Sequence, residues 1–360
     1  MTPPRAQLDA LTGARGLAAW LVVLYHIRLA LPDSVPPVVI AILAKGYLAV
    51  DLFFVLSGFV MWLTYGPKFQ SQGLAAAPDF LWRRIARIYP LHLVILLATL
   101  AYAATLMLAG KADTAQYPLA ELPLHILLMQ NWGLTDHLTW NDPSWSISTE
   151  LAAYLLLPFV AVTLFRKSWP PLACAGGALM LGIGLHIWFV SQDAATLGHD
   201  IVWNGLPRCI AGFFGGVLMA MAWRARPVAF ARHGALAISL SLFSLWVLGV
   251  LPETLAVPLS FTALVYWLAE TSAASGNPLA GRSAVYLGEI SYSTYLAHFL
   301  LWIAFKHIFV TDAANVALGL IALYIVAVYL ASELLYRLVE APGRVRLQSW
   351  GHRRRKHALN

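Results

Sequence analysis

The chain has 360 residues, of which 60% are hydrophobic and only 11% are charged, and its formal net charge is +7. With a mean hydropathy of +0.69, a soluble domain of this size would expose too much apolar surface to stay in solution. Several apolar stretches reach the roughly 20 residues that a helix needs to cross a bilayer, and the alternating pattern of a membrane barrel is absent. The composition therefore predicts an all-α, polytopic helical membrane protein.

The apolar stretches predict about ten transmembrane helices. In chain order they are 14–31, 47–65, 88–109, 145–165, 171–190, 202–223, 233–250, 255–270, 285–309 and 315–338. The segment 119–131 is apolar but too short to cross, so we expect it to lie on one membrane face or to dip into it. The first stretch resembles a secretory signal, but charged residues interrupt it and no small-residue cleavage site ends it, which favours a span.

The loops between these spans differ in charge on alternate sides. With the N-terminus in the cytoplasm, the outer stretches TDHLTWNDPS, SQDAATLGHD, LPE and VTDA hold acids and no Lys or Arg. The tail 343–360 and the inner loops then hold the basic residues, which in the loops are Lys68, Arg83, Arg84, Arg87, Arg166, Lys167, Arg224, Arg226, Arg232 and Arg282. The positive-inside rule predicts two cytoplasmic termini and explains most of the net charge without a nucleic-acid partner.

Two groups that are costly in a bilayer, Arg15 and His26, lie in the first predicted span. They are eleven positions apart, which at 100° per residue is about three turns plus ~20°. Both therefore face the same way, about 16 Å apart along the axis, and could line one passage. The alternative is a helix-end Arg that reaches the interface and a His satisfied by a neighbouring helix.

The second predicted span, GYLAVDLFFVLSGFVMW, has Asp51 near its outer end and Ser57 deeper. Asp51 is either an interfacial acid or the partner of a basic group such as His26. Small residues such as Ser57 and Gly58 also let helices approach closely, which is an alternative to a functional role.

Arg84 and Arg87 stand at the cytoplasmic start of the third predicted span, in DFLWRRIARIYPLHL. Residues three apart share one helix face, and two neighbouring guanidinium groups suit a phosphate-bearing ligand. Positive-inside anchoring of the helix end is the alternative.

The fourth predicted span carries Glu150 about one turn into its apolar part, where a carboxylate indicates function. Trp145, just before it, is either a residue of the interfacial belt or a stacking surface for a substrate. The ninth span contains His298 after a polar run, and Arg208 in the sixth is expected to neutralise an acid of the last two spans. These acids are Glu289, Glu333 and Glu340.

Cys174 and Cys209 fall in different predicted spans at different depths. We therefore expect neither a disulfide nor a metal site.

Six ordered motifs resemble those of the acyltransferase 3 family of bacterial membrane proteins. They are RGLAAWLVVLYH, which contains Arg15 and His26, then LAVDLFFVLSGF, RRIARIYP, WSISTE, SYSTYLAH and the terminal EAP. The resemblance covers about residues 8–342, which makes 8–342 the expected membrane domain and 343–360 a basic tail. One departure is LDALTGARGLA, which has three more residues before RGLA than the family's LDGLRGLA. Because the Arg-to-His spacing is intact, Arg15 stays the matching position.

The resemblance implies transfer of an acyl group, commonly acetyl, from cytoplasmic acyl-coenzyme A to a hydroxyl. The acceptor would be a carbohydrate or lipid-linked glycan, such as an exopolysaccharide or lipopolysaccharide precursor, at the periplasmic side of the inner membrane. Acyl-coenzyme A is then a donor substrate, and no cofactor is expected to be bound permanently. Some family members carry an extra extracytoplasmic domain; this chain has no room for one and is expected to act alone or with a separate partner. The sequence is also compatible with a homo-oligomer.

The resemblance also implies roles for the candidate residues around a central passage. Arg84 and Arg87 would hold the donor's phosphates, and the donor arm would run from Arg15 toward His26. His26 would take the proton of the acceptor hydroxyl, with Asp51 or Glu150 orienting it. A covalent acyl-histidine is the competing mechanism. The residues expected on the acceptor side or in support are Ser57, Trp145 and His298.

Three other function classes stay open. A proton-coupled transporter of a small solute would also use buried His, Glu and Arg, although such proteins more often show repeated halves. A different membrane acyltransferase fold would not explain the order of the motifs. A non-catalytic scaffold would not need Arg and His aligned on one helix face.

Overall fold

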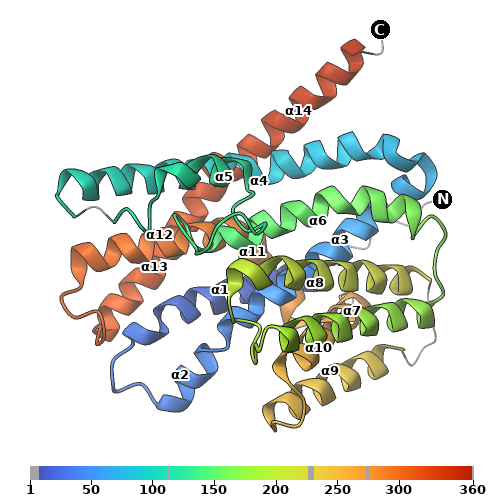
Figure 1. The fold of residues 1–360 in the computed structure, drawn as a ribbon, viewed down its shortest axis with the longest axis horizontal. Coiled ribbons are helices and arrows are strands. Elements are labelled where there is room, and N and C mark those ends of the chain that lie inside the picture. Colours follow the sequence, from blue (N-terminus) through green and yellow to red (C-terminus); the bar gives the residue numbers. More distant parts are fainter. Residues whose placement is uncertain (1–7, 112, 226–230, 273–275, 359–360) are drawn as a thin grey trace. The chain divides into compact units, whose positions relative to one another are not determined.

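The structure, a computed structural model, describes residues 8–111, 113–225, 231–272 and 276–358. These residues form helices and connecting loops and no strand (Figure 1). The chain divides into two compact units. Unit 1 holds the described parts of Met1–Ala18, Tyr47–Ala76 and Thr149–Glu289, and unit 2 those of Ala19–Gly46, Ala77–Ser148 and Ile290–Asn360.

Nine of the ten predicted spans overlap one long helix each, and most of the ninth, 285–309, lies on another. The helices are α1 (Asp9–Ile27), α3 (Ala49–Gln72), α4 (Ala77–Leu108), α6 (Ser144–Thr163), α7 (Pro171–Ser191), α8 (Ile201–Arg224), α9 (Ala231–Val247), α10 (Glu253–Thr271), α12 (Ser291–Phe309) and α13 (Leu318–Leu335). Shorter helices are α2 (Pro37–Leu43), α5 (Leu122–Leu127) and α11 (Arg282–Glu289), and α14 (Ala341–Ala358) ends the described chain. The all-helical class predicted from composition is confirmed.

Seven helical segments of the described chain are long and apolar enough to cross a membrane. One of them, Pro37–Leu108, has 72 residues and contains both α3 and α4. α9 has 17 residues and is therefore shorter than the seven, and α12 is less apolar because its first turns are Ser and Tyr. Such a set of helices is typical of a polytopic membrane protein. The number of ten spans stays a prediction.

Two predicted segments differ in detail. The ninth predicted span is interrupted, because α11 ends at Glu289 and α12 begins at Ser291. The segment 119–131 forms a short turn and the six-residue helix α5, which ends at Leu128 in the left-handed conformation with φ 56°. A helix of this length spans only about 9 Å. As expected, this segment is too short to cross a bilayer.

In unit 1, α8 packs against α3, α7 and α10, and α10 packs against α9 (Figure 1). Glycine sets the distance between α3 and α8. A Cβ added to Gly58 would lie 1.7 Å from the carbonyl oxygen of Phe213, and one added to Gly216 would lie 2.0 Å from that of Val55. Only glycine allows the two backbones to approach this closely, as in other membrane helix pairs.

In unit 2, α12 and α13 share an apolar core with the second half of α1 and the loop before α13. Its buried members are Val23, Ile27, Ala30, Trp302, Phe305, Val316, Ile321, Tyr324 and Val328. α13 continues into α14 through a π-helical turn, η6 (Tyr336–Glu340). α14 packs against α4, where the indole N–H of Trp82 donates to the carbonyl of Leu347 at 2.9 Å. The predicted tail thus begins as a helix held against α4.

Candidate active site

Two histidines of unit 2, on α1 and α12, face each other. The Nε2 atom of His298 lies 3.2 Å from the Nδ1 atom of His26. α1 is one continuous helix from Asp9 to Ile27 and therefore carries both Arg15 and His26. Arg15 and His26 can share one helix face, as predicted, only if the helix between them is unbroken. The structure shows that it is.

Backbone carbonyls assign the tautomers of both rings. The Nδ1 atom of His298 lies 2.7 Å from the carbonyl oxygen of Tyr295, which can only accept, so Nδ1 carries the proton. The Nδ1 atom of His26 lies 2.9 Å from the carbonyl oxygen of Val22, so it too is the donor. Neutral His298 thus turns an accepting Nε2 toward the N–H of His26. The Nε2 atom of His26 is left with a free lone pair, which is what a general base needs.

The two histidines differ in accessibility. His298 is completely buried, and the hydroxyl of Tyr324 donates to its carbonyl at 2.8 Å. His26 is partly exposed, and its ring contacts the edge of Phe299, with centroids 5.3 Å apart. His26 is therefore the more accessible of the two rings.

Polar groups from the loop before α6 and from the first turn of α6 hold the start of α12. The side-chain amide of Asn141 donates to the carbonyl of Leu296 at 3.0 Å, and the hydroxyls of Ser146 and Tyr295 are 2.8 Å apart. Trp145 is also buried. These bonds fix the turn whose Tyr295 carbonyl orients His298.

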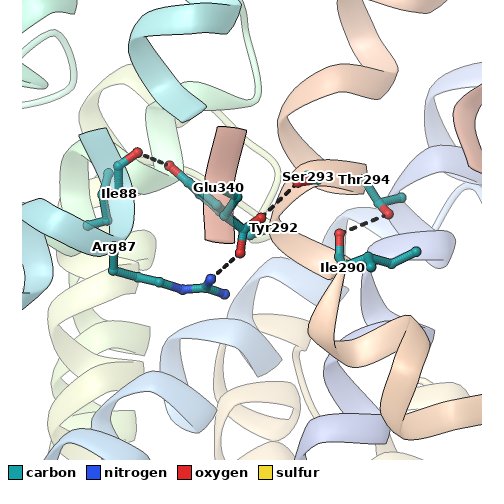
Figure 2. Close-up of polar contacts among 7 residues, drawn as sticks. All are labelled: Arg87, Ile88, Ile290, Tyr292, Ser293, Thr294 and Glu340. Carbon is teal, nitrogen blue, oxygen red and sulfur yellow. Dashed lines mark hydrogen bonds and ion pairs between the residues drawn. The ribbon is translucent and has the colours of Figure 1, made fainter. Parts of the chain in front are cut away.

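Arg87 is held by a carboxylate that the sequence did not assign to it. Its guanidinium donates to Oε1 of Glu340, and the hydroxyl of Ser293 donates to Oε2 at 2.7 Å (Figure 2). Nearby, the hydroxyl of Tyr292 donates to the carbonyl of Ile88 at 3.0 Å. Three motifs that are far apart in the sequence, RRIARIYP, SYSTYLAH and EAP, thus meet in one network of unit 2.

The other two arginines of this motif differ from Arg87. Arg83 donates through Nε to Asp79 at 3.0 Å, four residues earlier on α4. Arg84 lies one turn before Arg87 and is half-buried. Arg83 therefore has a local surface ion pair, whereas Arg87 has a long-range one.

Asp51, in unit 1, is paired with Arg208. Nε and Nη2 of Arg208 donate to the two carboxylate oxygens of Asp51 at 3.1 and 2.7 Å, and both side chains are buried. The basic partner of Asp51 is therefore Arg208, where the sequence offered His26 as one possibility. The acid bonded to Arg208 is Asp51 of the second predicted span, where the sequence had suggested an acid of the last two. The pair bridges α3 and α8, which already approach closely.

Glu150 and Ser57 are joined through Tyr154. The Tyr154 hydroxyl donates to Oε1 of Glu150 at 2.6 Å and lies 3.0 Å from the hydroxyl of Ser57. The predicted carboxylate and the predicted supporting serine thus belong to one chain of hydrogen bonds in unit 1.

A partly buried carboxyl group lies in the loop before α6. Asp142 precedes α6 and accepts a hydrogen bond from the amide of Gln116 at 3.0 Å. Burial raises the pKa of the Asp142 carboxyl to about 6. Within the described residues, no group of three or more His, Cys, Asp or Glu side chains is arranged to hold a metal ion.

The model of the family described as an acyltransferase domain (Acyl_transf_3) matches residues 8–337 of this chain. This is nearly the whole of the segment over which the six motifs occur.

Several curated proteins are similar over most of this chain. Acyltransferase MdmB of Streptomyces mycarofaciens is 28% identical over 376 residues, which cover 94% of this chain and 92% of that protein. Staphylococcus aureus proteins provisionally named O-acetyltransferases are 23% identical over 377 residues. The match covers 94% of this chain but 57% of their length, so the chain spans little more than half of these relatives. No solved structure matches.

Proposed function

Because this chain belongs to the acyltransferase 3 family and is an O-acyltransferase, we propose that it transfers an acetyl group from acetyl-coenzyme A to a hydroxyl of a carbohydrate or lipid-linked glycan. The observation that carries the proposal is the orientation of His26. Its Nδ1–H is held by Val22 and His298, so its basic Nε2 is the atom presented to a substrate. The names of the S. aureus relatives support acetyl as the acyl group.

His26 would act as the general base. Its Nε2 takes the proton of the acceptor hydroxyl while the hydroxyl oxygen attacks the thioester carbonyl carbon. A new C–O bond forms, the C–S bond breaks, and the thiolate of coenzyme A leaves and then receives the proton from His26. The imidazolium formed in between donates from Nδ1 to Val22 and to Nε2 of His298. His298 would therefore be a positioning residue, in the role first considered for Asp51 or Glu150. A covalent acyl-histidine is the alternative pathway.

The anionic end of the donor would bind at Arg84 and Arg87. Arg87 has five N–H donors, of which the structure assigns one to Glu340, and a guanidinium suits phosphate oxygens. The donor arm would extend along α1 from Arg15 to His26. This arrangement requires a cytoplasmic N-terminal end of α1 and an acceptor on the periplasmic side, and with ten spans the C-terminus would be cytoplasmic too. A reporter that is active only outside the cytoplasm, fused after Asn360, should be silent; an active reporter would reverse this topology.

The test is incubation of the purified protein with acetyl-coenzyme A labelled in the acetyl group. Release of free coenzyme A, together with labelled acetyl groups on an added glycan or labelled acetate from transfer to water, supports the acyltransferase. Intact donor with uptake of solutes into sealed vesicles would support the transporter instead. Comparison of acetyl-, succinyl- and longer acyl-coenzyme A identifies the acyl group. Label that stays on the protein at His26 would favour the covalent pathway.

A further inference from the structure

Glu340 is a completely buried carboxylate at the end of a π-helical turn. Both of its oxygens have partners, because Arg87 donates to Oε1 and Ser293 donates to Oε2 (Figure 2). The partners come from α4 and α12, so this one carboxylate joins three helical segments of unit 2. A buried charge that lost its counter-ion would be strongly destabilising, which ties the position of Arg87 to that of Glu340.

The guanidinium of Arg87 is restrained on two sides. Glu340 accepts from Nη1, and the guanidinium carbon lies 5.6 Å from the centre of the Tyr292 ring. The side chain of Arg87 is still 21% exposed, whereas that of Glu340 is not exposed at all. A planar guanidinium fixed at one nitrogen presents its other N–H groups in a defined direction. Arg87 thus has one end anchored in the protein and another open to a ligand.

The π-helical turn accounts for the position of Glu340. Such turns are rare and occur often at functional sites, and each shifts the register of the helix that follows it. Here the turn lies between α13 and α14 and ends at Glu340. Three residues later Gly343 faces Pro90 of α4, where an added Cβ would lie 2.6 Å from the proline ring. The same turn thus presents the carboxylate to Arg87 and starts the helix that packs along α4.

We propose that Glu340 is a positioning residue that holds the Arg87 guanidinium in the orientation that binds the phosphates of the donor. The inference rests on the proposed function, since it assumes a coenzyme A donor. It makes the end of α13 and the start of α14 part of the donor site. Glu340 itself does not touch the donor, because it is buried behind Arg87.

The chain offers a matched control seven residues earlier. Glu333 also pairs with an arginine, Arg337, which lies four residues on. The Arg337 side chain of this pair is 68% exposed, and both members belong to the same stretch of helix. Exposed pairs of this kind contribute little to stability. Glu333→Gln therefore removes a carboxylate and an ion pair without changing Arg87.

The experiment compares two donors with the same thioester. Acetyl-coenzyme A has the phosphates, and acetyl-pantetheine lacks them. Glu340→Gln should raise the KM for acetyl-coenzyme A by about tenfold to a hundredfold, the value of one charge-assisted hydrogen bond, and leave kcat within a few-fold. With acetyl-pantetheine, Glu340→Gln and wild type should have equal kcat/KM. Glu333→Gln should match wild type with both donors, and Glu340→Asp should recover part of the loss.

Two further variants test whether Glu340 acts through Arg87. Arg87→Ala should abolish the effect of Glu340→Gln, so that the double variant is no worse than Arg87→Ala alone. If Glu340→Gln does not fold, Ser293→Ala, which loosens the same carboxylate, should raise the same KM more weakly. An equal loss with both donors, a lowered KM, or behaviour like Glu333→Gln would overturn the inference. A wild-type protein that consumes neither donor would instead refute the proposed function.

Discussion

The Nε2 atom of His298 lies 3.2 Å from the Nδ1 atom of His26, although 272 positions separate the two residues in the chain. Because Nδ1 of His298 is bonded to the Tyr295 carbonyl, its Nε2 can only accept. The buried histidine therefore orients the accessible one, as a carboxylate does in many hydrolases.

His26→Gln should abolish transfer without abolishing donor binding. Glutamine keeps a polar group of similar size but cannot take a proton, and removal of a general base typically costs about 10²–10⁴-fold in rate. The measurement is the single-turnover rate with donor at saturation, together with the donor Kd. A rate within a few-fold of wild type would show that His26 is only a satisfied membrane histidine.

His298→Leu should lower kcat and leave the KM for the donor unchanged, because His298 acts through His26. His298→Gln retains an oxygen that can accept from His26, so it should recover much of the rate lost by His298→Leu. The comparison of kcat between the two variants is the measurement. Equal rates would mean that the acceptor atom of His298 has no part in the reaction.

Arg84→Ala and Arg87→Ala should each weaken donor binding by roughly 1.5–3 kcal/mol, the range for a hydrogen bond between charged groups. Arg83→Ala is the matched control, since Arg83 has the same charge on the same helix but pairs locally with Asp79. Titration of each purified variant with acetyl-coenzyme A provides the Kd. If donor binding is unchanged in both Arg84→Ala and Arg87→Ala, or falls equally in Arg83→Ala, these arginines do not bind the donor. They would then only anchor the end of the helix.

Asp51→Asn should destabilise the protein by roughly 3–5 kcal/mol, because it removes the carboxylate that pairs with the buried Arg208 guanidinium. The double variant Asp51→Leu with Arg208→Met should recover most of this loss, since it buries no charge. Thermal unfolding in detergent measures both. If Asp51→Asn is as stable as wild type but inactive, the structural role of Asp51 is contradicted. The catalytic role expected from the sequence would then be supported.

The stability of the wild-type protein should decline as the pH rises from about 4 to about 6, and Asp142→Asn should remove this decline. The folded protein keeps the Asp142 proton up to a pKa of about 6, whereas an unfolded chain releases it near 3.9. The stabilisation is therefore complete below about pH 4 and is lost as the pH rises through about 6, by roughly 1–3 kcal/mol in total. The midpoints of thermal unfolding at pH 4.5 and pH 7 should differ less in Asp142→Asn than in wild type. An equal difference in the two proteins would contradict a raised pKa of Asp142.

Much of the fold was predictable because it depends on local properties. A bilayer-spanning helix requires a contiguous apolar run, so the positions of the long helices follow from hydropathy alone. The common face of Arg15 and His26 follows from the periodicity of one continuous helix. The order of the motifs, which is also a property of the sequence, indicated the family that the family model then matched. The interruption at Ile290 was missed, because hydropathy averages over a single non-helical residue.

The partners of the charged groups were decided by the tertiary structure. Asp51 and Arg208 are 157 positions apart, and Arg87 and Glu340 are 253 positions apart. No local pattern indicates which helices become neighbours. From the sequence, several acids were therefore candidate partners of Arg208, and no acid was assigned to Arg87. The π-helical turn that ends at Glu340 has no hydropathy signal either, because it continues an apolar helix. The sequence by itself determined which groups lie within helices and on which helix face. Helix packing decided which of them meet, because a buried charge must find its counter-charge on whichever helix the fold places beside it.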